Sequence, residues 1–149
     1  MEKPPKILIL NGPNLNLLGQ REPEIYGTET LSDIHDMCEE YGQKNGLDID
    51  FRQSNHEGQL IDWIQDALED TDAVMINAAG YTHTSVAIHD ALKILDVPIV
   101  EIHISDPEKR ENFRHFSYIA PTAIKVIKGK GTKGYTEGLD FLKQHLSTN

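Results

Sequence analysis

The sequence has little of what several large classes of protein require. It contains one cysteine, Cys38, so no internal disulfide can form. Its 14 basic residues stand against 24 acidic ones, and the net charge of −10 disfavours nucleic acid and anionic membranes, which both need a basic face. No apolar stretch approaches the roughly 20 residues of a membrane span, and residues 1–6 lack the apolar core of a signal peptide. We therefore expect a cytoplasmic protein.

The single thiol lies in a segment with helical spacing. Leu31, Ile34, Cys38 and Tyr41 fall on one face of a helix, which makes core filling the favoured interpretation of Cys38 over a nucleophile.

Short runs rich in isoleucine and valine alternate with stretches of helical pattern. Strands are expected at residues 6–10, 48–53, 73–77, 99–104 and 123–127. Helices are expected at 31–44, 59–69, 85–95 and 136–145, with a short helical turn within 107–113. Thr30 and Asp33 have the spacing of a capping box. The βα repeat predicts an α/β fold, a flavodoxin-like doubly wound sheet of five parallel strands, in a single domain over residues 1–149.

Ligands of such sheets bind outside the carboxyl ends of the strands, so the segments that follow the strands should carry the site. Those segments are polar here: residues 11–16, a long loop through 19–27, then 77–85 and 103–106. Together with Glu101 in the fourth expected strand and the nearby Arg114, they supply the candidate residues Asn14, Arg21, Tyr26, Asn77, His83, Glu101, His103 and Arg114.

Glu101 and His103 stand two residues apart in a run, residues 98–104, that otherwise reads as a strand buried on both faces. Side chains alternate along a strand, so both project to the same side, with the carboxylate placed to orient the imidazole. Such a buried pair suggests proton chemistry. A purely structural ion pair in the core is an equal alternative from these two residues alone.

Other kinds of site are disfavoured by residue type and position. Residues 129–134 spell G-x-G-x-x-G, but they follow the last strand instead of opening the first βαβ unit, so a glycine-rich turn is expected. The seven histidines have no metal-ligand spacing. Lys125 and Lys128 alternate with apolar residues without isolating either amine, which disfavours an imine. Asn11 and Asn77 stand where a phosphate-accepting receiver domain needs acidic residues, and the loop at 11–16 lacks the hydroxyls of a flavin phosphate site.

The block L-N-G-P-N-L-N-L-L-G at residues 10–19, continued by Arg21-Glu22-Pro23 and Tyr26-Gly27, resembles a block of the type II 3-dehydroquinate dehydratases. Residues 77–85 are similar to the N-x-x-x-x-T-H-T-S segment of that family. Residues 101–105, with Arg110 and Phe113-Arg114, are similar to its E-x-H-x-S…R…F-R segment. The resemblance spans nearly the whole chain in the same order.

The resemblance implies a reaction on a small molecule. 3-Dehydroquinate would lose water by anti elimination through an enolate, giving 3-dehydroshikimate in the shikimate pathway to aromatic compounds, with no metal or other cofactor. Tyr26 is implied as the base, with its pKa lowered from about 10 by Arg21. Asn14 would stabilise the enolate oxygen, and His103, oriented by Glu101, would be the general acid.

The resemblance also implies binding roles and an assembly. Asn77, Ile104 and Ser105 would hold the substrate carboxylate, and His83 and Arg114 its ring hydroxyls. Asp90 is implied to reach a neighbouring subunit, in a homo-oligomer expected to be a dodecamer built from trimers. The loop at residues 19–27 is expected to act as a lid over the active site.

The chain departs from the family pattern at a few positions. Asp106 stands where asparagine is usual. It either repels the substrate carboxylate or caps the turn that begins at Pro107, and we favour the cap. Lys109 and Lys125 are expected to affect surface or subunit contacts only. The alternative function is a non-catalytic flavodoxin-like module that binds a small anion or a partner protein. An enzyme acting on a neighbouring hydroxylated ring acid is a weaker third hypothesis.

Overall fold

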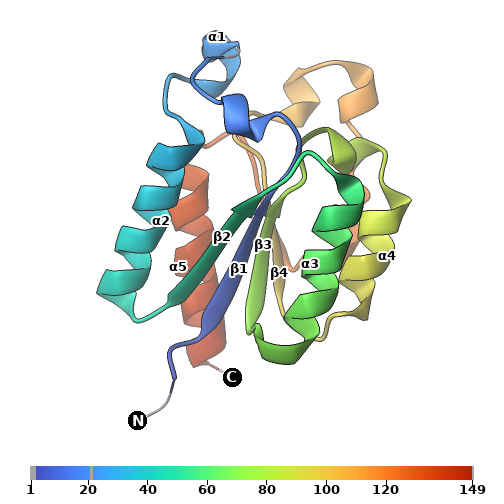
Figure 1. The fold of residues 1–149 in the computed structure, drawn as a ribbon. Helices are drawn as coiled ribbons and strands as arrows, with labels where there is room; N and C mark the ends of the chain where they lie inside the picture. The colour runs from blue at the N-terminus through green and yellow to red at the C-terminus, as the bar shows by residue number, and fades with distance from the viewer. Residues whose placement is uncertain (1–2, 21, 149) are drawn as a thin grey trace.

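The computed structural model describes residues 3–20 and 22–148 and shows a parallel sheet between two layers of helices (Figure 1). The strands are β1 (Lys6–Asn11), β2 (Asp48–Gln53), β3 (Ala73–Asn77), β4 (Ile99–Ile102) and β5 (Lys125–Ile127). They lie in the spatial order β2-β1-β3-β4-β5, and each neighbouring pair is parallel. This order is the doubly wound, flavodoxin-like one, which confirms the predicted fold.

Two pairs of helices cover the two faces of the sheet (Figure 1). One face carries α2 (Leu31–Asn45) and α5 (Lys133–Ser147), and the other carries α3 (Glu57–Asp70) and α4 (Val86–Ile94). The short elements are α1 (Pro23–Tyr26) and the 3-10 turns η1 (Leu15–Leu17), η2 (Ala79–His83), η3 (Pro107–Lys109), η4 (Asn112–Arg114) and η5 (Ala120–Thr122). Within the described ranges, no helix is both long and apolar enough to span a bilayer.

Helix α2 begins where the sequence predicts. Thr30 Oγ1 accepts a hydrogen bond from the Asp33 amide at 3.1 Å, and Asp33 Oδ2 accepts one from the Thr30 amide at 2.9 Å, which confirms the capping box. Cys38 is fully buried on this helix. Burial and the neighbouring Glu39 carboxylate raise the pKa of its thiol to about 12, so it is protonated at neutral pH and fills the core as predicted.

Some predicted boundaries were wrong. Strand β4 ends at Ile102, two residues early, and β5 begins at Lys125, two residues late. The amide of His103 still donates to the carbonyl of Ile127 at 2.9 Å, and the chain then leaves the sheet. Part of the expected loop at residues 19–27 forms α1, with Pro23 at the first turn, a position proline favours.

Helix α5 begins at Lys133, three residues before the predicted start. It contains two glycines, which should weaken a helix but here allow it to lie close to the sheet. A Cβ atom on Gly138 would lie 2.7 Å from Met75 Sδ and 3.1 Å from Ile102 Cδ1. A Cβ atom on Gly134 would lie 3.4 Å from Ile127 Cγ2. This close approach brings Tyr135, which has no exposed surface, beneath the carboxyl ends of the central strands.

The packing of α5 predicts the effect of one added methyl group. Gly138→Ala should lower the free energy of unfolding by about 1–3 kcal/mol, because the new Cβ overpacks the contact with Met75. Urea unfolding followed by circular dichroism measures this change. The control is Gly58→Ala in α3, where an added Cβ meets nothing within 4 Å. Equal stability of Gly138→Ala and the wild type would show that α5 does not depend on this close approach.

Candidate active site

A pocket open to solvent lies at the carboxyl edge of the sheet around the ends of β1, β3 and β4. The described residues that line it include two arginines, two histidines and no carboxylate, in a chain of net charge −10. This lining favours an anionic ligand. The lining residues are Pro13, Asn14, Leu15, Asn77, Ala79, Gly80, His83, His103, Ile104, Ser105, Pro107, Arg110 and Arg114.

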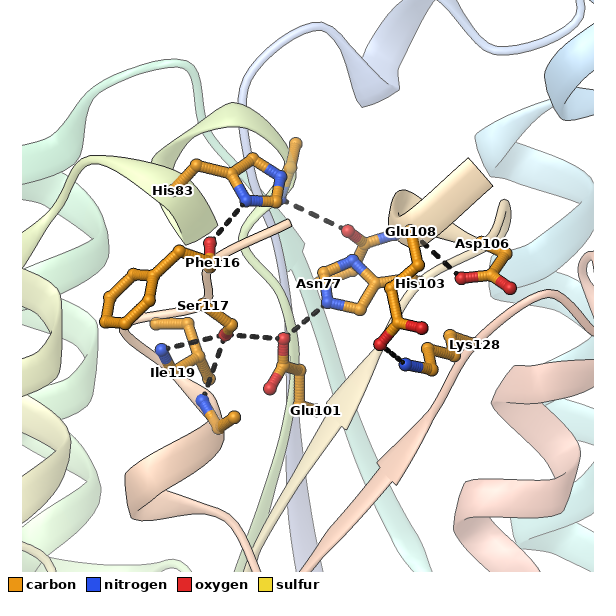
Figure 2. A network of polar contacts seen from close by, with 12 residues as sticks. Asn77, His83, Glu101, His103, Asp106, Glu108, Phe116, Ser117, Ile119 and Lys128 are labelled. Carbon is orange, nitrogen blue, oxygen red and sulfur yellow. Dashed lines mark hydrogen bonds and ion pairs between the residues drawn. The ribbon is translucent and has the colours of Figure 1, made fainter. Parts of the chain in front are cut away.

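The predicted pair of acid and imidazole forms at the end of β4. Glu101 and His103 lie on the same side of the strand, and Glu101 Oε2 contacts His103 Nε2 (Figure 2). Glu101 is 1 % exposed and His103 8 %. An ionised carboxylate only accepts hydrogen bonds, so Nε2 donates and Nδ1 is the ring nitrogen that can serve a molecule in the pocket. The pair therefore leaves the imidazole fixed in orientation and one nitrogen available.

Ser117, which the sequence analysis missed, is the second partner of the buried carboxylate. Its hydroxyl accepts hydrogen bonds from the amides of Ile119 at 3.1 Å and Ala120 at 3.0 Å, and its proton is directed to Glu101 Oε2 at 2.8 Å (Figure 2). Glu101 Oε1 is buried and has no partner among the described residues. One carboxylate oxygen thus accepts from both the serine and the histidine, which limits how the carboxylate can rotate.

His83 stands across from His103, with the two ring centroids 6.4 Å apart. Its Nδ1 lies 2.8 Å from the carbonyl oxygen of Phe116, so Nδ1 carries the proton (Figure 2). Burial lowers the pKa of His83, and the nearby positive charges of His103 and Arg114 lower it further. The hydrogen bond to Phe116 and the charge of Glu101 act in the opposite direction but do not cancel this shift. In its neutral form His83 offers Nε2 as a hydrogen-bond acceptor.

Asn14 follows β1 in a left-handed conformation, with φ of 70°, which asparagine tolerates better than most residues. The side chain of Asn55 accepts a hydrogen bond from its amide at 3.0 Å, and the Asn55 carbonyl accepts one from the Tyr81 hydroxyl at 2.9 Å. The sequence analysis also missed Asn55. The rule that polar residues follow strands would have found it, because it comes two residues after β2.

Ile104 and Ser105 follow β4 and line the pocket. Their carbonyl oxygens accept hydrogen bonds from the amides of Gly131 at 3.0 Å and Gly129 at 3.1 Å. Their own amides meet no acceptor in the described part of the chain, so both can donate to a ligand. Arg110 Nη1 donates to Ser105 Oγ at 3.4 Å. The predicted glycine-rich turn therefore supports the pocket, although its last two residues belong to α5.

Other predicted residues fall elsewhere. Arg21 lies outside the described residues, and Tyr26 is described only as the last backbone position of α1. Asp90 is exposed on α4 and does not line the pocket of its own chain. Arg114 lines the pocket and donates from Nε to Glu111 Oε1 at 3.0 Å. Across residues 3–20 and 22–148, no group of three or more histidine, cysteine or acidic side chains is placed to hold a metal ion.

Asp106 caps η3, as the favoured interpretation predicts. Its Oδ1 accepts a hydrogen bond from the Glu108 amide at 3.1 Å, and Pro107 stands at the first turn (Figure 2). Lys109 and Lys125 are exposed, and the Lys125 ammonium lies 5.9 Å from the centre of the Phe141 ring. These departures from the family pattern are therefore cap and surface positions.

The sheet order and the pocket at its carboxyl edge define a doubly wound α/β protein with a small-molecule site. The family described as dehydroquinase class II matches residues 5–143. A 3-dehydroquinate dehydratase of Variovorax paradoxus is 56% identical over 135 residues, which cover 87% of this chain and 92% of the relative. The type II dehydroquinases of Butyrivibrio crossotus and Propionibacterium acnes are each 45% identical with TM-scores of 0.91. The match to the Butyrivibrio crossotus structure covers 93% of this chain and 97% of that one. The match to the Propionibacterium acnes structure covers 97% of this chain and 98% of that one. The chain belongs to the class II dehydroquinase family.

The cap at η3 generates a prediction for the residue that departs from the family pattern. Asp106→Asn should change the KM for the ligand of the pocket less than about twofold, because asparagine caps a helical turn as well as aspartate does. Steady-state kinetics measures KM, and thermal melting checks that the cap is retained. A KM several-fold lower in the variant would instead support repulsion between Asp106 and an anionic ligand.

The lowered pKa of His83 generates a prediction about stability. In the unfolded chain this histidine titrates near its ordinary pKa of about 6.5, above its folded pKa. Above that pH both states hold a neutral ring, and below it the unfolded state binds the proton first. The wild type should therefore lose more stability than His83→Gln between about pH 8 and about pH 5.5. Urea unfolding at both pH values tests this. An equal loss in the two proteins would show that His83 titrates normally in the folded state.

Proposed function

We propose that this chain is a 3-dehydroquinate dehydratase, which removes water from 3-dehydroquinate to give 3-dehydroshikimate in the shikimate pathway. The observation that carries the proposal is the buried Glu101–His103 pair beside a cationic pocket, in a chain that belongs to the class II dehydroquinase family. The substrate is an anion with ring hydroxyls, and the pocket offers donors and positive charge with few competing carboxylates.

The elimination begins with a proton removed from the carbon next to the ketone. We assign this step to the phenolate of Tyr26, with the Arg21 guanidinium lowering the pKa of the phenol so that the phenolate is populated. The electron pair of the broken C–H bond passes to the ketone oxygen and forms an enolate. Asn14, which lines the pocket, is assigned to stabilise that oxygen by hydrogen bonding.

The second half of the reaction expels the hydroxyl group on the opposite face. The enolate collapses, a carbon–carbon double bond forms next to the ketone, and the C–O bond breaks. His103 supplies the proton that lets the oxygen leave as water, and it does so from Nδ1, because Nε2 is held by Glu101. Glu101 keeps the ring in place before and after the transfer. The proton taken up by Tyr26 balances the one that His103 gives away.

The remaining lining residues bind the parts of the substrate that do not react. Asn77 and the free amides of Ile104 and Ser105 are assigned to the carboxylate. The acceptor nitrogen of His83 and the guanidinium of Arg114 are assigned to the ring hydroxyls. This arrangement requires no cofactor and no metal.

The proposal extends to the wider organisation of the enzyme. We propose one catalytic domain over residues 1–149 that acts in the cytoplasm, with residues 19–27 as a lid. We also propose a dodecamer built from trimers, in which Asp90 serves the pocket of a neighbouring subunit. The exposure of Asp90 on α4, away from the pocket of its own chain, supports that role.

One experiment tests the proposed function. Purified protein treated with a chelator is mixed with 3-dehydroquinate, and the ultraviolet absorbance of the conjugated enone product is followed. The wild type should produce the absorbance rise, and Tyr26→Phe should reduce kcat by about 10²–10⁴-fold, as expected for loss of a general base. Tyr41→Phe is the matched control, because that phenol contacts Asp140 between α2 and α5.

The outcomes separate the hypotheses. No absorbance rise from a folded wild type would favour the non-catalytic binding module. A rise that Tyr26→Phe leaves unchanged would keep the dehydratase and remove Tyr26 as the base.

A further inference from the structure

Tyr135, on α5, is a buried polar residue that the proposed mechanism does not use. It has no exposed surface, and its hydroxyl meets two asparagines at the carboxyl ends of the central strands. The hydroxyl donates to Asn11 Oδ1 at 2.7 Å, at the end of β1. It accepts from Asn77 Nδ2 at 3.2 Å, at the end of β3. A residue near the C-terminus therefore holds a side chain that lines the pocket.

The surrounding hydrogen bonds fix the direction of this contact. Asn11 Nδ2 donates to the carbonyl of Arg52 at 3.0 Å, so its Oδ1 is the atom that faces Tyr135 and requires a donor. Burial raises the pKa of the Tyr135 phenol above its ordinary value, so the hydroxyl is neutral and carries its proton. That single proton is given to Asn11, which leaves the oxygen as the acceptor for Asn77.

The carboxamide of Asn77 is held from its other end as well. Its Oδ1 accepts a hydrogen bond from the Ala79 amide at 3.2 Å (Figure 2). A flipped carboxamide would place Nδ2 against that amide, with two donors facing each other. With Oδ1 accepting from the Ala79 amide and one Nδ2 proton bound to Tyr135, the second Nδ2 proton is the donor of this side chain that is left for a ligand. Asn77 is therefore held so that an N–H donor is available to the pocket that it lines.

We propose that Tyr135 is a positioning residue that fixes the Asn77 carboxamide so that it presents one N–H to the substrate carboxylate. The proposal rests on the proposed function, which assigns the carboxylate to Asn77. The carboxylate takes no part in bond breaking, so a loosely held Asn77 weakens the ground state and the transition state alike. Loss of the Tyr135 hydroxyl should therefore raise KM and leave kcat nearly unchanged.

The first test compares two tyrosine variants in α5 and its partner helix. Tyr135→Phe should raise the KM for 3-dehydroquinate by about three- to tenfold, the size expected for one lost hydrogen bond, with kcat changed less than about twofold. Tyr41→Phe also removes a hydroxyl that contacts α5, and it should leave KM unchanged. A lower melting temperature in Tyr135→Phe with an unchanged KM would overturn the proposal and assign Tyr135 to stability alone.

A double-mutant cycle shows whether Tyr135 acts through Asn77. In the Asn77→Ala background, Tyr135→Phe should cause no further rise in KM, because the group that it positions is gone. An equal rise in both backgrounds would overturn the proposal. An inactive wild type would instead overturn the proposed function, so the two failures are distinguishable.

A measurement on the wild type does not depend on how well Tyr135→Phe folds. Nuclear magnetic resonance of nitrogen-labelled protein resolves the two Nδ2 protons of Asn77, assigned by their loss in Asn77→Ala. Addition of the product 3-dehydroshikimate should shift one of these protons strongly and the other, held by Tyr135, weakly. Equal shifts of both, or a shift of neither while the product binds, would contradict the proposed position of the carboxamide.

Discussion

A carboxylate buried at the carboxyl edge of the sheet is the constraint on which the site depends. β4 is buried on both faces, so Glu101 cannot reach water, and an unpaired charge at such a position would destabilise the fold by several kcal/mol. Two side chains pair with the Glu101 carboxylate. His103 comes directly after β4, and Ser117 lies between η4 and η5. The orientation of the imidazole is therefore set by its contact with Glu101 and by its position directly after an inner strand of the sheet.

The rest of the pocket extends the same arrangement. Pocket residues that follow a strand are held in place by hydrogen bonds from other parts of the chain to their backbone groups. Asn55 holds the amide of Asn14, and Gly129 and Gly131 hold the carbonyls of Ser105 and Ile104. The side chains that remain toward the pocket include two arginines and two histidines, which favour an anionic ligand.

The fold and much of the pocket could be predicted from the sequence, because both follow from local periodicity. Alternation placed Glu101 and His103 on one side of a strand, and the carboxyl-edge rule placed Asn14, Asn77 and Ser105 together. Ser117 and Tyr135 could not be found in this way. Their contacts span 16 residues to Glu101 and 58 residues to Asn77, and a hydroxyl in a loop or on a helix has no pattern that reveals its partner. The early start of α5 was missed because glycine weakens a helix in isolation, whereas here it permits close packing on the sheet.

The contact between Asn77 and Tyr135 also has a consequence for how the enzyme is made. Asn77 ends the third strand, near the middle of the chain, and one of the two contacts that orient its carboxamide forms only when α5 is in place. The ribosome releases α5 after all five strands, so the first three strands can pair during synthesis while the pocket still lacks this contact. Ligand affinity is then linked to completion of the whole fold, and a chain truncated before α5 would release a sheet without a finished site.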